Sequence, residues 1–337
     1  MHKYALIAAA VSVGAVSLTA FGQTPAPIVL YSAIGYGQKV ADGFTKATGI
    51  PVKLVDLSTG PLVAKVQAEK QNPQWNLAWF DGAEAMRDLA NQGMLLKGWE
   101  PNVKWSALSK KVRPSDKAYT PGGVTLAGVF LVNTKLVPED KTPQSWQDLL
   151  KPEWKGLVGM PNPAVSGPTY PLVAGLMQSL GSEAAGKALL VSLKANGLKT
   201  FDTGGPLVKQ LYAGAIAVAA TQSTRGVAGL VNKEAVRVVF PKGVSLLPSD
   251  FGISAKGTPE AQESAKKFIE YFLSVEGQKI ALNSGDSDGY YYPLIEGVSA
   301  HPLATPLEKI KYQSVDPNFW GPREAAINTW FANTIAR

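Results

Sequence analysis

The sequence predicts an α/β protein of two lobes, each built on a parallel-rich mixed sheet, with two strands crossing between the lobes as a hinge. Short apolar runs alternate along the chain with segments whose apolar residues recur at helical spacing. Strand, helix and strand in succession give parallel sheets covered by helices. The length of 337 residues exceeds what one hydrophobic core usually serves, which favours two lobes.

Seven apolar runs are expected to be strands: residues 28–31, 52–55, 77–80, 126–133, 157–160, 215–220 and 237–240. The helical spacing of Val40 and Phe44 predicts a helix after the first run, and that of Leu62 and Val66 predicts another after the second. Segment 259–274 is the clearest expected helix, because its apolar residues fall on one face.

Segments 119–132 and 241–253 are expected to carry the chain between the lobes, because each runs from a loop with proline and glycine into a long apolar stretch. Two lobes joined by two crossings can close on a small molecule. The expected organisation is lobe 1 over 23–127 and 246–300, an inserted lobe 2 over 128–245, and C-terminal helices over 301–337 whose lobe is left open.

The N-terminus has the pattern of a cleavable secretory signal over residues 1–22. Lys3 precedes an apolar run of about 15 residues, and small residues follow up to Gly22. That run is shorter than the roughly 20 residues of a membrane span. The chain has no cysteine, so it offers neither disulfides nor a cysteine for a lipid anchor. We expect a free protein of the periplasm.

The formal net charge of +7 comes from positive side chains that are scattered along the chain. The densest group, Lys110, Lys111 and Arg113, is too small for a nucleic-acid stripe and is expected to be a solvated face. The charge is compatible with attraction of anionic solutes. We expect no nucleic-acid partner.

The sequence offers few residues for catalysis. After the signal, His301 is the only histidine, and the chain has no cysteine. Neither a P-loop nor a dinucleotide fingerprint is present. An exported hydrolase is therefore a minor alternative, and we expect no enzyme, no cofactor and no zinc site.

A hydroxyl residue, glycine and proline occur together three times, each time before a helical pattern, at 58–61, 166–168 and 203–206. Proline suits the first helical position, a Ser or Thr just ahead can cap the helix, and glycine lets a ligand approach the backbone. The free N–H groups and the dipole of such helix ends bind anions. Converging ends would form an anion site, whereas the alternative is three ordinary capped helices.

Longer segments give the chain a family resemblance that covers nearly all of it after the signal. The segments are 29–32 (VLYS), 44–50 (FTKATGI), 68–74 (AEKQNPQ), 145–150 (SWQDLL), 155–156 (KG), 266–269 (KKFI), 272–274 (FLS) and 276–278 (EGQ). In order and spacing they resemble periplasmic solute-binding proteins of ABC importers. The branch that the chain resembles holds ferric-ion binders and binders of 2-aminoethylphosphonate. The resemblance implies a type II periplasmic binding protein that works with an inner-membrane ABC permease.

One loop separates the two branches of that family. Ferric binders carry two adjacent tyrosines where this chain has residues 221–225 (TQSTR), and the histidine that they often place near Gly35 is also absent. Asp81 keeps one possible metal ligand, and the Ser166-Gly167 turn is similar to the place where ferric binders hold their accompanying anion. The resemblance therefore implies a phosphate or phosphonate solute, with 2-aminoethylphosphonate as the best candidate and ferric ion as the alternative.

Three consecutive tyrosines at 290–292 follow Asp286 and Asp288 and would suit a hard metal. Adjacent tyrosines in an extended segment point to opposite faces, so we expect packing instead.

Candidate ligand contacts come from the loops named above. Arg225 would pair with a phosphoryl group or be a surface charge, Asp81 and Asp250 would bind an amine or cap turns, and Tyr31 and Tyr170 would wall the ligand or pack. The partners expected are a small anionic or zwitterionic solute and the permease, with the protein itself a monomer. The full set of candidates is Tyr31, Ser32, Ser58, Thr59, Gly60, Asp81, Ser166, Gly167, Thr169, Tyr170, Thr203, Gly204, Ser223, Thr224, Arg225 and Asp250.

Overall fold

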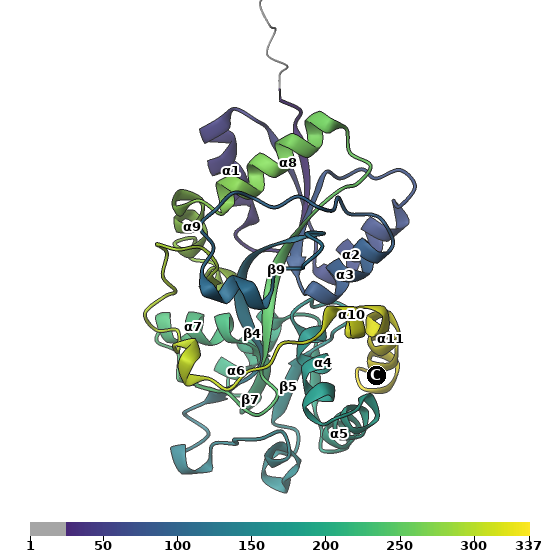
Figure 1. Ribbon diagram of the computed structural model, residues 1–337. Coiled ribbons are helices and arrows are strands. Elements are labelled where there is room, and N and C mark those ends of the chain that lie inside the picture. Colours follow the sequence, from purple (N-terminus) through teal and green to yellow (C-terminus); the bar gives the residue numbers. More distant parts are fainter. Residues whose placement is uncertain (1–24) are drawn as a thin grey trace, which may run out of the picture.

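The computed structural model describes residues 25–337, and the predicted signal at 1–22 lies outside the described residues. One 10-stranded sheet runs through the molecule in the order β2-β1-β3-β9-β4-β7-β5-β6, with β8 and β10 each paired to β4. Helices cover both faces (Figure 1). The predicted α/β class with mixed sheets is confirmed.

The strands are β1 (Ile28–Ser32), β2 (Val52–Asp56), β3 (Leu77–Asp81), β4 (Thr120–Asn133), β5 (Val158–Pro161), β6 (Lys199–Phe201), β7 (Val218–Gln222), β8 (Val236–Val239), β9 (Ser245–Ile253) and β10 (Tyr292–Pro293). The longer helices are α1 (Gly37–Thr48), α2 (Thr59–Ala68), α3 (Ala83–Asn91), α4 (Thr169–Ser179), α5 (Glu183–Ala195), α6 (Gly204–Tyr212), α7 (Ser223–Val231), α8 (Pro259–Phe272), α9 (Val275–Leu282), α10 (Pro317–Trp320) and α11 (Glu324–Thr334). Every predicted strand is found. The short strands β6 and β10 are not predicted.

Two half-sheets make up the molecule. In the first, β1 is parallel to β2 and β3, and β9 runs antiparallel to β3. In the second, β5 is parallel to β6 and β7, and β4 runs antiparallel to β7. Each half has its own buried clusters on the two faces of its sheet.

The long strands β4 and β9 join the halves by pairing with each other, from Thr120 opposite Phe251 to Ala127 opposite Ser245. All 14 residues of β4 are buried. At Gly128, φ is +83° and the register shifts, so β4 turns there from one half-sheet to the other. The predicted crossing segments thus correspond to β4 and β9, and the lobe boundaries stay predictions.

The tyrosine run packs as its alternation predicts. Tyr291 donates its hydroxyl to Gln278 at 3.0 Å in the first half, and Tyr292 donates to the carbonyl of Thr305 at 2.7 Å. The C-terminal helix α11 buries Ile327 and Phe331 in the cluster that holds α4 and α5. The segment before α11 lies against α3 of the first half.

Burial raises the pKa of Glu84, which is 3% exposed in the first turn of α3, to about 7. A carboxyl whose pKa is higher in the folded than in the unfolded state holds an extra proton when folded, between about pH 4.5 and 7. The free energy of unfolding therefore falls as the pH rises through that window.

We expect Glu84→Gln to raise the free energy of unfolding at pH 8 by roughly 1–3 kcal/mol, because glutamine need not ionise in the buried site. The gain should shrink towards pH 5. Urea unfolding at several pH values measures it, with exposed Glu153→Gln as the control. A gain that does not change with pH would contradict this account.

Candidate functional site

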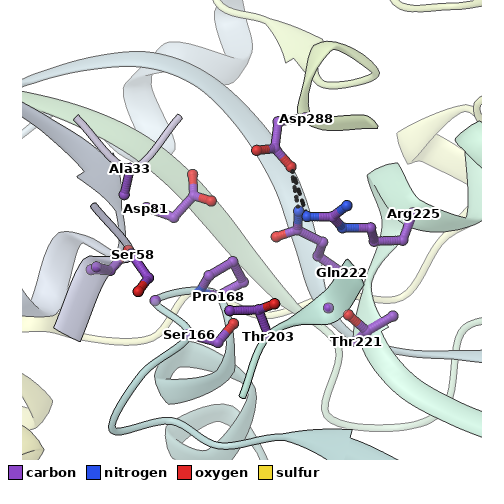
Figure 2. A pocket seen from close by; sticks show the side chains of 13 residues that line it. Ala33, Ser58, Asp81, Ser166, Pro168, Thr203, Thr221, Gln222, Arg225 and Asp288 are labelled. Carbon is purple, nitrogen blue, oxygen red and sulfur yellow. Dashed lines mark hydrogen bonds and ion pairs between the residues drawn. The ribbon is translucent and has the colours of Figure 1, made fainter. Parts of the chain in front are cut away.

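A cavity with about 80 Å³ of space lies between the two halves of the molecule. Its walls come from the ends of β1 and β3, the starts of α2, α4, α6 and α7, and a short helical turn, η5 (Ser287–Gly289). Figure 2 shows these side chains around one space. The lining residues are Ala33, Ser58, Thr59, Asp81, Ser166, Gly167, Pro168, Thr203, Gly204, Thr221, Gln222, Arg225 and Asp288.

Three helix N-termini reach this cavity, and they are the three that the hydroxyl, glycine and proline pattern predicts. Ser58 and Thr203 precede α2 and α6 with extended backbones, and Pro168 precedes α4. Within the described chain, neither Ser58 nor Thr203 makes a side-chain capping bond to its own helix. Among the first N–H groups of these helices, that of Gly60 donates to the carbonyl of Val165, and those of Thr169 and Tyr170 donate to the carbonyls of Ser166 and Gly167. The hydroxyl residues Ser58, Ser166 and Thr203 line one part of the cavity, which we call the anion end.

Two carboxylates lie towards the other end of the cavity, which we call the acid end: Asp81 after β3 and Asp288 on η5 (Figure 2). Asp288 accepts hydrogen bonds from the backbone N–H of Gly35 (3.2 Å) and the side-chain amide of Gln222 (3.0 Å). Its nearest cation is Arg225 of α7, with nitrogen and oxygen 3.5 Å apart.

Burial raises the pKa of Asp81 well above its usual range, and the neighbouring charge of Asp288 raises it further, while Arg225 opposes both effects. Burial also raises the pKa of Asp288, again against Arg225. Two carboxyls thus face one guanidinium. An additional positive group would be stabilised there.

Eight of the sixteen predicted ligand contacts line this cavity: Ser58, Thr59, Asp81, Ser166, Gly167, Thr203, Gly204 and Arg225. Thr224 lines a smaller chamber next to it. Arg225 is not a surface charge: its guanidinium lies 3.5 Å from Asp288, and its Nε lies beside Gly204 at the start of α6 with no partner among the described residues. Its pairing with a phosphoryl group stays a prediction.

The structure does not bring the remaining predicted contacts to the cavity wall. Four of them bond elsewhere in the fold: Tyr31 bonds Glu69, Ser32 accepts from the N–H of Ile34, Tyr170 donates to the carbonyl of Trp320 at 2.6 Å, and Ser223 bonds Thr125. Thr169 is buried at the first position of α4, and its hydroxyl has no partner among the described residues. The N–H of Gly60 donates to the carbonyl of Val165.

The predicted placement of Asp250 on the cleft side is wrong. In the ladder between β3 and β9, Asp81 lies opposite Ser249 and Asp250 lies opposite Phe80. Because neighbouring residues of a strand point to opposite faces, Asp250 faces away from Asp81. It is fully buried, and burial together with Glu84 raises its pKa.

Sequence reasoning missed Asp288 and Gln222 as contacts of the cavity. Asp288 stands about 200 residues from Asp81 and carries no local pattern beyond its closeness to the tyrosine run. Gln222 ends β7 and directly precedes α7. Its position after an apolar strand, three residues before Arg225, was the available signal.

Glycines on both sides of the cavity let the two halves touch. The N–H of Gly60 donates to the carbonyl of Val165 at 3.2 Å, which joins α2 to the loop before α4. A methyl group on Gly60 would overlap the carbonyl oxygen of Ala164, and one on Gly167 would overlap the side chain of Thr59. The glycines, expected to let a ligand approach, also permit this closed arrangement of the halves.

Residues 25–337 show neither a metal-binding cluster nor a membrane span. No three His, Cys, Asp or Glu side chains gather there in a way that would hold a metal ion. No helix in that part of the chain combines the length and apolar character needed to cross a bilayer.

Comparison with known proteins gives a consistent assignment. A family model described as bacterial extracellular solute-binding protein matches residues 77–317. A putative 2-aminoethylphosphonate-binding periplasmic protein of Salmonella typhimurium is 27% identical over 243 residues, covering 70% of this chain and 68% of the relative. The major ferric iron-binding protein of Neisseria meningitidis serogroup B is 25% identical over 345 residues, covering 96% of both chains.

Solved structures share the fold. The periplasmic binding protein AfuA from Actinobacillus pleuropneumoniae, with fructose-6-phosphate bound, has a TM-score of 0.82 at 21% identity and covers 92% of this chain and 99% of its own. Iron-bound HitA from Pseudomonas aeruginosa has a TM-score of 0.76 at 20% identity, covering 90% and 99%. The predicted two-lobed periplasmic binding protein fold is confirmed.

We expect Gly60→Ala to fold normally but not to reach this closed arrangement, because the added methyl group overlaps Ala164 across the cavity. Gly60 does not have a positive φ, so alanine suits its backbone. Gly205→Ala is the control, since its methyl group would meet nothing within 4 Å among the described residues.

Because the chain has no cysteine, spin labels on Lys70→Cys and Lys209→Cys can report the separation of the halves. The solute is one that raises the thermal stability of the wild-type protein. A short separation with solute should appear in the wild type and the control and be absent in Gly60→Ala. Equal closure in all three proteins would refute the role of Gly60.

Proposed function

The chain belongs to the family of bacterial extracellular solute-binding proteins, the binding components of ABC importers, and we propose that its solute is a small phosphonate or phosphate compound, 2-aminoethylphosphonate above all. Proteins of this family bind solutes and are not enzymes, so the prediction of no enzymatic activity is confirmed.

The observation that carries the proposal is the division of one cavity into an anion end and an acid end. The hydroxyls of Ser58, Ser166 and Thr203 and the dipoles of three helix N-termini suit a phosphoryl group, with the guanidinium of Arg225 beside the start of α6. Asp81 and Asp288, which have Arg225 as their shared cation, suit a positive group. A zwitterion with a phosphonate at one end and an ammonium at the other matches both.

Names of relatives support the same solute class. The Salmonella relative is described as a putative 2-aminoethylphosphonate binder, and the structural neighbour AfuA was solved with a sugar phosphate. Ferric ion remains the alternative because of the Neisseria relative. Against iron, the lining of the main cavity in the described chain includes no tyrosine, and residues 221–222 are threonine and glutamine.

The proposed location is the periplasm, as for the relatives named above. There the protein would deliver its solute as a monomer to an inner-membrane permease. The cleavable signal at 1–22 stays a prediction.

We expect Ser166→Asp to abolish phosphonate binding, because a carboxylate at the anion end would repel the phosphoryl group. Ser166→Ala should reduce the binding free energy by only about 1.5–3 kcal/mol, the contribution of one hydrogen bond to a charged group. Calorimetry with 2-aminoethylphosphonate and with ethylphosphonate measures both. If phosphonates bind Ser166→Asp as tightly as the wild type, Ser166 does not contact the solute and has only a structural role.

We expect Asp81→Asn to weaken the binding of 2-aminoethylphosphonate more than that of ethylphosphonate, because only the first ligand carries an amine that can pair with Asp81. Asp202→Asn removes the same charge from an exposed position outside the cavity lining and serves as the control.

Calorimetry of both ligands on the wild type and both variants gives the difference directly. A thermal-shift panel with sugar phosphates and ferric salts runs beside it. If Asp81→Asn lowers the affinity for the two phosphonates equally, Asp81 does not recognise the amine. Stabilisation by ferric salts alone would replace the proposed solute by iron.

A further inference from the structure

A second, smaller chamber opens beside the acid end and shares Asp81, Gln222 and Asp288 with the main cavity. We call it the inner chamber. The centre of a water molecule can occupy about 10 Å³ of this chamber, which is close to the space needed to hold one water. Its lining consists of Ile34, Tyr36, Asp81, Gly123, Thr125, Gln222, Thr224, Leu247, Ser249, Asp288 and Tyr291.

Two buried polar atoms of this lining have no partner in the described chain: Oε1 of Gln222 and Oγ1 of Thr224. Their residues are only 3% and 1% exposed. The orientation of the Gln222 amide follows from its partner, because its nitrogen donates to Asp288 and leaves its oxygen facing the opening. Figure 2 shows this oxygen and the carboxylate of Asp81 directed into the same space.

Several atoms of the inner chamber can accept a hydrogen bond. The oxygen of Gln222 can only accept, whereas the hydroxyl of Thr224 can accept or donate. The carboxyls of Asp81 and Asp288 add negative charge when ionised, and Arg225 is the cation that they share. Thr125 is already bonded to Ser223. A donor with several N–H groups and a positive charge would satisfy the unpaired oxygens and face both carboxyls.

We propose that the inner chamber receives a primary ammonium group of the solute and excludes ammonium groups that carry methyl substituents. The three N–H donors would reach Asp81, Gln222 and Thr224, and the charge would face both carboxyls. An –NH3⁺ group is about the size of a water molecule, whereas a trimethylammonium group is several times larger than the chamber. This inference rests on the proposed function, which places an amine at the acid end.

Three ligands test the selectivity by calorimetry: 2-aminoethylphosphonate, its N,N,N-trimethyl derivative and ethylphosphonate. The wild-type protein should prefer the first by at least tenfold and bind the trimethyl compound no better than ethylphosphonate. In Thr224→Val, which keeps the shape of threonine, the preference should fall about tenfold or more while ethylphosphonate binding is unchanged.

Thr221→Val is the matched control, because the Thr221 hydroxyl lies beside Gly204 at the anion end. Thr221→Val should weaken the binding of 2-aminoethylphosphonate and of ethylphosphonate by the same factor. Equal effects of Thr221→Val and Thr224→Val on every ligand, or tight binding of the trimethyl compound, would overturn the proposal.

A phosphonate-free experiment separates this inference from the proposed solute. Methylammonium chloride should raise the melting temperature of the wild type more than tetramethylammonium chloride or sodium chloride at equal concentration, and Thr224→Val should lose the difference. If no phosphonate binds but this selectivity is found, the proposed solute is wrong and the ammonium site in the inner chamber is supported. If phosphonates bind with no preference for an amine and the three salts act alike, the ammonium site is wrong and phosphonate binding at the anion end is supported. If neither phosphonates nor methylammonium have an effect, both proposals are wrong.

Discussion

The pairing of β4 with β9 is the constraint on which the rest of the structure depends. These two strands are the only elements among those described that take part in both half-sheets, and they hydrogen-bond to each other where the chain crosses. A change in the relative orientation of the halves must therefore bend this ribbon, and it must also move the C-terminal segment that contacts both halves. The cavity lies beside the ribbon, so the ribbon brings together a carboxylate after β3 and the helix starts after β5 and β7.

The sequence predicts the fold further than the site. Apolar runs locate the strands because burial selects apolar residues whatever their partners are. The three helix starts were predictable because hydroxyl, glycine and proline act locally. The predicted position of Asp250 is wrong by one residue, because neighbouring residues of a strand point to opposite faces. All residues of β9 are buried, so the apolar pattern of this strand does not show which face each residue occupies. Asp288 depends on tertiary contact between η5 and α7, which no local pattern encodes.

Gly60 and Gly167 show how a correct pattern can have a second physical meaning. At the start of a helix, a glycine lets a ligand approach the backbone, and this was the reason to single out both turns. In the structure the same small residues admit the opposite half of the protein, through the bond from Gly60 to Val165 and the contact of Gly167 with Thr59. The contact between the halves thus depends on these two small residues, so a bulkier residue at either position would disturb it.

Charge links that closure to the proposed choice of solute. The net charge of +7 resides elsewhere, since the cavity lining holds one arginine and two aspartates. At the anion end, the proposed phosphonate would meet neutral hydroxyls and helix dipoles, with Arg225 as the one cation of the lining. At the acid end, desolvation makes two ionised carboxyls with one guanidinium unfavourable, and the raised pKa values express that cost. An ammonium group would remove it, whereas a simple anion would not. A zwitterion would then be preferred because it corrects an electrostatic imbalance in the empty site, and less because it makes more contacts.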